Sequence, residues 1–345
     1  MKIAEIGTSQ RTCWQLCRAK HYHAFVMGKG GSGIAPLAEP LAPLFGRCGH
    51  YALQVWYWHL ANGAHPEEAC GMASEAVRKF VQEQRAEMAK AFGGRPPSYI
   101  DGDGSELTLV ESFLNGYASY YADDRHLDII SIEWSFTIPA EIFYDDPSAR
   151  DLPSCRGTID LVFDTPDGPV IMDHKFNQYL ETDLTSRASF WPQAINYARA
   201  AEVSFGKVAG FILNQIRKPT SLRPTNGESF DDFLSRIRSE YVSYPDYNGD
   251  YPRKRGYFLR SGILPILEGG RARRYLEEQK RLDREIVEAY AGMEAPAVGE
   301  PPPHIRRNWD ACHRWGAHCE YLDLCEYGYN PATLAAFQER EEVHM

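Results

Sequence analysis

The sequence predicts an α/β protein in which helices flank a mixed central sheet. Apolar side chains recur at helical spacing through the first third of the 345 residues, whereas strand patterns begin near residue 127. Beyond these strands, helical and strand patterns alternate along the chain. An order of helices, three strands, helix and strand is typical of a small mixed sheet covered by helices.

Four helices are predicted before the sheet, and Gly-rich breaks interrupt them. The helical patterns span Gln10–Met27, Leu44–Asn62, Pro66–Phe92 and Leu107–Ala122. The breaks are Gly28–Gly33 and Gly93–Gly104. The first break, GKGGSG, lacks the terminal Lys-Ser/Thr pair of a phosphate-binding loop, so we expect a connector there.

Strand patterns dominate the middle of the chain. Asp128–Pro139 alternates apolar and polar side chains, and Gly157–Lys175 predicts a hairpin around the turn Asp164–Gly168. The later predicted elements are helix Trp191–Ala201, strand Val208–Ile216, helix Phe230–Tyr241, strand Gly256–Leu259, helix Gly269–Tyr290 and a proline-rich connector over 296–303. We expect one integrated domain with three parts: a helical part (1–126), a sheet core (127–268) and a charged helix with a cysteine-rich tail (269–345).

The composition is that of a soluble globular protein, with 43% apolar and 24% charged residues. No run approaches the roughly 18 uninterrupted apolar residues that a membrane span needs. The N-terminus also lacks the apolar core of a signal peptide. We therefore expect a cytoplasmic location and no membrane partner.

The net charge of −10 argues weakly against a nucleic-acid partner, but the charge is unevenly distributed. Residues 253–285 contain ten Lys or Arg and five acidic residues, which gives this segment a net charge of +5. A basic stripe on an acidic protein can follow a phosphate backbone. The alternative, for residues 271–285, is a solvated helix with intrahelical ion pairs.

The hairpin Gly157–Lys175 contains the residues with the clearest chemistry. Asp173 and Lys175 stand two residues apart in a strand, so their side chains leave one face and that of His174 leaves the other. Pairing of the two arms can bring Asp160 to the same face, which gives oxygen ligands for a hard divalent cation beside an ammonium. The alternative is a surface hairpin with solvated charges. However, Asp173 ends an apolar run, where a carboxylate needs a partner or a metal.

Two further pairs of residues lie at helical spacing. Gln193 and Tyr197 are four residues apart and share a helix face, from which they could contact DNA or orient Lys175. The alternative for this pair is ordinary half-buried surface. Gly46 and His50 lie at the start of a helix whose later residues are apolar or aromatic. A single His there is either a satisfied core residue or a metal ligand.

In order, these residues resemble the motifs of the PD-(D/E)XK nuclease superfamily, and within it the RecB-like branch that includes the AddB type and the CRISPR adaptation nucleases. The branch pattern is Gly-x3-His, Gly-x2-Asp, Asp-x-Lys and Gln-x3-Tyr. It corresponds here to Gly46 and His50, Gly157 and Asp160, Asp173 and Lys175, Gln193 and Tyr197. The resemblance covers roughly residues 9 to 330 and implies a restriction-endonuclease-like fold.

The resemblance also implies roles for these residues. His50, Asp160 and Asp173, joined by the backbone carbonyl of His174, would bind Mg or Mn. Lys175 would position or help deprotonate the attacking water and stabilise the charge that develops on the phosphoryl group.

Eight cysteines without a secretory signal argue against a disulfide framework. Cys312, Cys319 and Cys325 cluster near the C-terminus, and thiolates from both ends of a chain suggest an iron–sulfur or zinc site. The pattern resembles AddB-type nucleases, which have one cysteine before the nuclease core and three after it, ending in Cys-x5-Cys. This resemblance implies a 4Fe-4S cluster held by these three residues and Cys17, which is preferred to Cys13.

One spacing departs from the AddB pattern. The expected Cys-x2-Cys is absent because Gly316 occupies the position, and Cys312 precedes Cys319 by seven residues instead. The alternative is a zinc site in which His313 or His318 replaces a cysteine. A third interpretation is a set of core thiols without metal. The remaining residues Cys48, Cys70 and Cys155 are expected to be core thiols.

These expectations favour a metal-dependent deoxyribonuclease. It would be an exonuclease on single-stranded DNA or DNA ends in recombination, repair or CRISPR adaptation, with a recombination or CRISPR protein as partner. Glu133, on the strand before the hairpin, is a candidate further acid near the metal, and a surface glutamate is the alternative. The alternative function is a noncatalytic DNA-binding or recombination accessory protein on the same fold, and RNA is a third interpretation of the substrate.

Overall fold

The structure is a computed structural model that describes residues 3–27, 32–36, 41–91, 105–181, 183, 191–219, 224–225, 227–246, 256–293, 301, 304–312 and 318–339. The chain divides into two compact units. The terminal unit consists of Met1–Ala38, Ser135–Gly157 and Glu268–Met345, and the central unit consists of Glu39–Trp134 and Thr158–Leu267.

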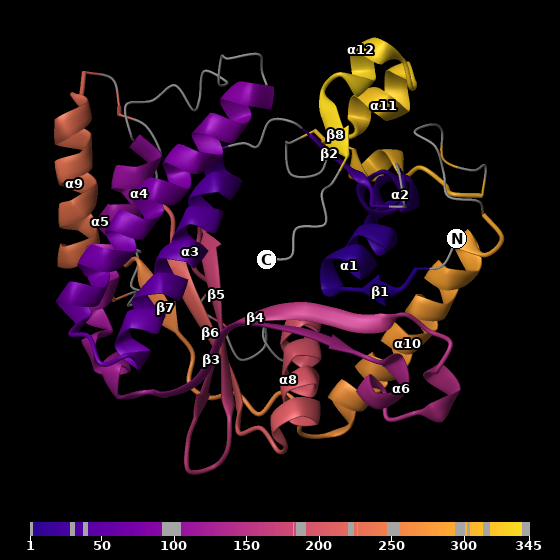
Figure 1. The fold of residues 1–345 in the computed structure, drawn as a ribbon, viewed down its shortest axis with the longest axis horizontal. Helices are drawn as coiled ribbons and strands as arrows, with labels where there is room; N and C mark the ends of the chain where they lie inside the picture. The colour runs from indigo at the N-terminus through magenta and orange to yellow at the C-terminus, as the bar shows by residue number, and fades with distance from the viewer. Residues whose placement is uncertain are drawn as a thin grey trace. The chain divides into compact units, whose positions relative to one another are not determined.

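A mixed sheet organises the fold (Figure 1). Its strands are β1 (Glu5–Ile6), β3 (Asp128–Ile138), β4 (Ser154–Asp164), β5 (Val170–Asn177), β6 (Gly210–Arg217) and β7 (Phe258–Arg260). They pair in the order β1-β4-β5-β6-β7, and β3 pairs with β4. β5 is antiparallel to β4 and parallel to β6, whereas β7 is antiparallel to β6. This confirms the predicted α/β class with a mixed central sheet.

The strand β5 is covered on both faces. Val170, Ile171 and Met172 are fully buried, as expected for a strand with a parallel neighbour and packing on each side. The ring of His174 stacks on Tyr57 from the helix side, with ring centroids 5.5 Å apart. On the opposite face, Lys175 lies over the Trp191 ring at 4.9 Å. The two neighbouring side chains therefore leave opposite faces, as the strand period predicts.

Helices of the central unit build its apolar core. They are α3 (Leu41–Ala61), α4 (Pro66–Ala91), α5 (Ser105–Tyr120), α8 (Pro192–Phe205) and α9 (Phe230–Ser243), with the 3-10 turn η2 (Ala122–His126) after α5. Figure 1 shows α3, α4, α5 and α9 grouped beside the strands β5, β6 and β7. Trp56 and Phe113 of these helices share one buried cluster with Met172 and Ile216 of the strands, which fixes α3 against the sheet.

The terminal unit combines segments from both ends of the chain. It contains α1 (Thr8–Leu16), α2 (Arg18–Phe25), α6 (Ala140–Phe143), η3 (Pro147–Ala149), α10 (Gly270–Tyr290), η4 (Trp309–Ala311), α11 (Leu322–Tyr327) and α12 (Pro331–Leu334). A two-stranded antiparallel sheet pairs β2 (Ile34–Pro36) with β8 (Phe337–Glu339). Trp14 and Tyr22 pack with Ile286 and Tyr321 in the buried core of this unit.

A buried ion pair joins α1 to α10 within the terminal unit. Arg11 donates hydrogen bonds from Nε and Nη2 to the two carboxylate oxygens of Asp283, at 2.6 and 2.7 Å. The hydroxyl of Tyr144 donates to the same carboxylate at 2.6 Å, and Gln279 donates to that hydroxyl. These contacts satisfy charged groups that would be costly to bury alone.

Most predicted helices are confirmed, but the single helix expected over Gln10–Met27 is wrong. Two helices occupy this range, and Cys17 between them has an extended backbone (φ −160°, ψ 115°). Its sulfur accepts a hydrogen bond from the backbone N–H of Asn308 at 3.3 Å. Asn308, almost 300 residues away in the sequence, therefore contacts the chain where the two helices meet. The periodicity of a helix does not reveal such a contact.

Several predictions fall outside the described residues. These are residues 28–31 of the first Gly-rich break, the whole break Gly93–Gly104, almost all of the connector 296–303, the basic residues Arg253, Lys254 and Arg255, and the positions His313 and Gly316. Within the described ranges, no helix is both long enough and apolar enough to cross a membrane.

Candidate metal centre

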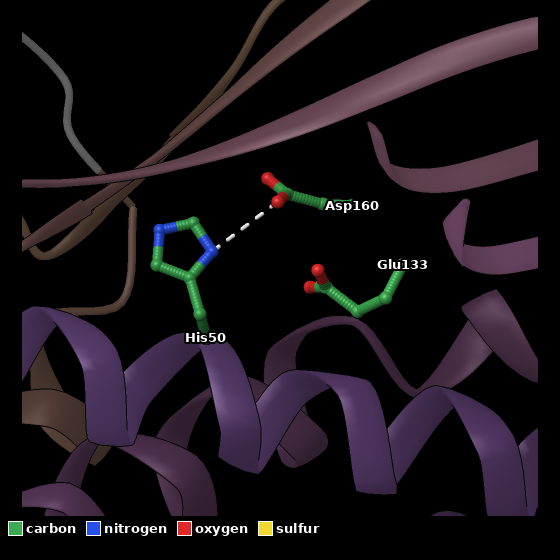
Figure 2. Close-up of side chains that lie close together, drawn as sticks. All are labelled: His50, Glu133 and Asp160. Carbon is green, nitrogen blue, oxygen red and sulfur yellow. Dashed lines mark ion pairs between the residues drawn. The ribbon is translucent and has the colours of Figure 1, made fainter. Parts of the chain in front are cut away.

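A close contact between a helix and the sheet brings His50 to the hairpin. His50 lies on α3, and the neighbouring Gly49 faces the ring of Phe176 on β5. A Cβ at Gly49 would lie only 2.4 Å from the nearest atom of that ring, so a side chain there would push the helix away. At the observed approach, His50 Nδ1 is 3.3 Å from Asp160 Oδ1 (Figure 2).

Asp160 on β4 is held at both carboxylate oxygens. Oδ1 faces His50, and Oδ2 accepts a hydrogen bond from the backbone N–H of His174 at 2.6 Å. Burial alone would raise the pKa of Asp160, but the charge and hydrogen bond of His50, together with His174 and Lys175, outweigh burial and lower the pKa. The pKa of His50 is raised despite its burial, because the Asp160 carboxylate stabilises the imidazolium.

Glu133 completes a compact group with these two residues. Ligand atoms of His50, Glu133 and Asp160 all lie within 4.8 Å of one another, and Figure 2 shows the three side chains converging. Glu133 has a φ of 49°, which is unusual for a residue other than glycine in the middle of a strand. Its pKa is raised to about 7, first by burial and then by the charge of Asp160. The half-buried position differs from the surface glutamate that the sequence left open.

Asp173 and Lys175 form an ion pair beside this group. Lys175 Nζ lies 2.7 Å from Asp173 Oδ2, and the Asp173 side chain is only 1% exposed. Burial raises the pKa of Asp173 to about 6, although Lys175 opposes the shift. The ammonium is thus the partner of the buried Oδ2. A carboxylate oxygen has a second lone pair, so Asp173 can still accept a cation.

Gln193 and Tyr197 share a face of α8 as predicted, and Gln193 Nε2 donates to the Tyr197 hydroxyl at 2.7 Å. Burial raises the pKa of Tyr197, and the negative charge of Asp173 raises it further. The Tyr197 hydroxyl is thus neutral, and it lies close enough to Asp173 for an electrostatic interaction. The pair adds hydrogen-bonding capacity on the side of the sheet where Lys175 lies.

The four predicted cluster cysteines lie near one another within the terminal unit. Burial raises the pKa values of Cys312 and Cys325, and the charge of Cys17 raises both further. The backbone N–H of Cys319 donates to the carbonyl of Cys312 at 2.8 Å. These sulfur atoms do not form a group within 4.8 Å. The alternative zinc ligand His318 is exposed.

Residues 8–326 match a protein-family model described as the PD-(D/E)XK nuclease superfamily. The chain belongs to the PD-(D/E)XK nuclease superfamily. The comparison with curated proteins finds no match for it.

Nucleases of the PD-(D/E)XK superfamily use divalent metals and act on DNA, and the donor set of this chain fits such a cation. His50, Glu133 and Asp160 supply one nitrogen and carboxylate oxygens at close range. The buried carboxylate of Asp173 lies close enough to interact electrostatically with Glu133 and Asp160, and Lys175 is its charged partner. The raised pKa values of Glu133 and Asp173 reflect the cost of charging buried carboxylates, which a hard cation would relieve.

Two residues that shape this candidate metal centre were not identified from the sequence. Gly49 permits the close approach of α3 to β5, and its only signal was a second glycine directly before His50. The Lys175 ammonium lies over the Trp191 ring. From the sequence, Trp191 was predicted only as the first residue of a helix. A cation over an indole ring is stabilised by the ring quadrupole, so Trp191 helps to hold Lys175 in place.

We predict that Gly49→Ala destabilises the protein by about 1–3 kcal/mol and weakens Mn²⁺ binding, because the new methyl group overlaps the Phe176 ring. Chemical denaturation and a Mn²⁺ titration measure the two effects. The matched control is Gly71→Ala on α4, where a Cβ meets no atom within 4 Å. That change should add about 0.5–1 kcal/mol of stability. Equal behaviour of the two variants contradicts the packing argument.

We predict that Glu133→Gln stabilises the metal-free protein at pH 8 but not at pH 4.5. The folded pKa of about 7 exceeds the usual value of 4.5, so the folded state binds more protons between these pH values. The contribution of Glu133 to stability therefore falls as pH rises through this window, and Gln avoids the loss. We expect a gain of about 2 kcal/mol at pH 8, measured by denaturation with chelator.

The control for this change is Glu202→Gln on α8, which removes a glutamate paired with Arg199 at 2.6 Å. It should give no gain at pH 8. A Glu133→Gln variant whose stability relative to wild type is the same at both pH values contradicts the raised pKa.

Proposed function

We propose that the protein is a RecB-like nuclease that hydrolyses DNA phosphodiester bonds with Mg²⁺ or Mn²⁺. The substrate would be single-stranded DNA or DNA ends, cut as an exonuclease in recombination, repair or CRISPR adaptation. The observation that carries the proposal is the convergence of His50, Glu133 and Asp160 beside the Asp173–Lys175 ion pair. These residues follow the motif order of the RecB-like branch.

In this proposal His50, Asp160 and Asp173 hold the cation, with the backbone carbonyl of His174 and with Glu133 as the further acid. The bound cation would polarise the phosphoryl group and lower the pKa of water. Asp160 is prepared for this task because the His174 N–H fixes one oxygen and leaves the other toward His50.

Lys175 would serve the water and the phosphoryl oxygens. Its ammonium is held by Asp173 on one side and the Trp191 ring on another, so few orientations remain open to it. A fixed cation at this place can orient an attacking water and stabilise charge that grows in the transition state. Gln193 and Tyr197 would hydrogen-bond the DNA or keep Lys175 in position.

The charged helix α10 supports a DNA partner. Its exposed residues include Arg273, Arg274, Arg281 and Arg284. Lys280 instead forms ion pairs with Asp146 and Glu277, each at 2.7 Å, so the intrahelical alternative accounts for part of the charge. The exposed guanidinium groups remain suited to phosphate oxygens.

We also propose that Cys17, Cys312, Cys319 and Cys325 bind an iron–sulfur cluster, with 4Fe-4S as the expected type. The electrostatic coupling of Cys17 with Cys312 and Cys325 supports a shared site. The cluster would join α1 to the C-terminal segment of the same unit.

We predict that Lys175→Ala lowers the cleavage rate at least about 100-fold while DNA binding is retained, because the ammonium acts on the transition state. The assay uses end-labelled single-stranded and duplex DNA with Mn²⁺, and chelator as a blank. Lys79→Ala, an exposed lysine on α4, is the matched control and keeps full activity. A wild-type protein that binds DNA but never cuts it supports the noncatalytic alternative and overturns the proposal.

We predict that Cys17→Ser abolishes the brown colour of protein purified without oxygen, whereas Cys13→Ser retains it. Cys13 is buried, which raises its pKa to about 12, and it is coupled to Cys17 and Cys319 rather than to the whole set. Visible absorbance before and after reduction, together with iron analysis, measures the outcome. A colourless wild-type protein that contains zinc contradicts the cluster.

A further inference from the structure

A half-buried arginine, with 16% of its side chain exposed, lies behind the candidate metal centre on the helix side of the sheet in the central unit. Arg260, at the end of β7, donates from Nη1 and Nη2 to the two oxygens of Asp124 at 2.7 and 2.8 Å. The guanidinium also stacks over the Tyr121 ring, 3.6 Å from its centroid. Asp124 belongs to η2 and is 7% exposed. A fork of this kind fixes the orientation of both groups.

Two tyrosines and an asparagine extend this pair toward β5. The Tyr57 hydroxyl donates to Asp124 at 2.7 Å and lies 2.9 Å from the Tyr117 hydroxyl. Tyr117 accepts hydrogen bonds from Arg260 at 2.9 Å and from Asn214 Nδ2 at 2.8 Å. We refer to Tyr57, Tyr117, Asp124, Asn214 and Arg260 as the anchor network.

The anchor network ends on the ring of His174. Asn214 Nδ2 is 2.8 Å from His174 Nδ1, and Arg260 Nε donates to Asn214 Oδ1, which assigns the amide orientation. The amide nitrogen is therefore the donor and His174 Nδ1 the acceptor. Tyr57 stacks on the same ring with an interplanar angle of 7°. The His174 ring is thus fixed both in its plane and against its face.

His174 separates the two charged residues Asp173 and Lys175 on β5. Its backbone N–H donates to Asp160 Oδ2 at 2.6 Å. A shift of His174 along or away from the sheet would thus move Asp160 and both neighbouring side chains together. Networks behind metal ligands orient those ligands, and their loss commonly weakens metal affinity 10–100-fold.

Stability alone does not explain a polar network at this depth. Apolar residues of similar volume often replace a buried ion pair without loss of stability. Hydrogen bonds, however, have defined lengths and directions, so they specify position more tightly than apolar contacts. Here the hydrogen bonds specify the position of His174, which lies between Asp173 and Lys175.

We propose that the anchor network positions the metal centre by clamping the His174 side chain from the opposite face of the sheet. Tyr117 and Asn214 are then positioning residues that never touch the metal or the DNA. The effect on metal binding rests on the proposed function, because the backbone N–H of His174 donates to Asp160 and its carbonyl is a proposed metal ligand.

The terminal unit offers a matched control. Arg11 and Asp283 form a second arginine–aspartate pair, and the hydroxyl of Tyr144 hydrogen-bonds both partners. Around Arg260, Tyr57 hydrogen-bonds both the arginine and Asp124, and Tyr117 hydrogen-bonds the arginine. Tyr144→Phe and Tyr117→Phe each remove one hydroxyl from such a pair. Only the second is connected to His174, so the two variants separate positioning from general stability.

The experiment uses the full-length protein with Asn214→Ala, Tyr117→Phe and Tyr144→Phe. Mn²⁺ affinity is measured by electron paramagnetic resonance of free Mn²⁺, and hydrogen exchange of the His174 amide is measured without metal. We expect Asn214→Ala to weaken Mn²⁺ binding about tenfold and to speed His174 exchange by a similar factor. Tyr117→Phe should change both in the same direction by a smaller factor, and Tyr144→Phe should change neither.

Wild-type exchange at His174 in both Asn214→Ala and Tyr117→Phe overturns the inference. So does an equal effect of Tyr144→Phe on exchange and affinity. A wild-type protein that does not bind Mn²⁺ overturns the proposed function instead, and the metal-free exchange rates still decide whether the network clamps His174. Tyr117→Phe keeps the ring in place, so the test does not depend on the folding of Asn214→Ala.

Discussion

The antiparallel pairing of β4 with β5 is the constraint on which the site depends. Leu161 pairs with Met172 at the end of this ladder, and Asp160 and Asp173 are the next residues on their two strands. Two carboxylates thus meet in a buried place, which is electrostatically unfavourable unless positive groups surround them. His50 from α3 and Lys175 from β5 provide these groups in the absence of a cation. The apolar strand residues that hold the register are therefore as important to the site as its charges.

Much of this arrangement follows from local periodicity. The alternation of a strand separates His174 from its two charged neighbours, and the helical repeat brings Gln193 and Tyr197 within hydrogen-bond distance. Glu133 was harder to assign because its left-handed backbone breaks the alternation of β3. The helix break at Cys17 was also missed, since the contact at it comes from Asn308.

The anchor network lies beyond the reach of sequence patterns for another reason. Arg260 and Asp124 are 136 residues apart, and Arg260 ends a strand of only three residues. Nothing in either local sequence distinguishes a half-buried arginine from an exposed one. The two units each contain an arginine–aspartate pair with tyrosine hydroxyls, yet only one of them touches a residue of the hairpin. The two arginine–aspartate pairs thus have similar chemistry, but only the pair that contacts a hairpin residue can influence the candidate metal centre.

The pairing of β2 with β8 has a consequence for the order in which the protein folds during synthesis. Residues 34–36 find their partners at 337–339, so this small sheet forms only after residue 339 has left the ribosome. All residues of the central unit precede residue 268, so this unit can begin to fold earlier. Helices α1 and α2, although made before α10, must wait for α10 and β8 to cover their apolar faces. These two helices thus reach their native packing only after residues more than 250 positions later have been made.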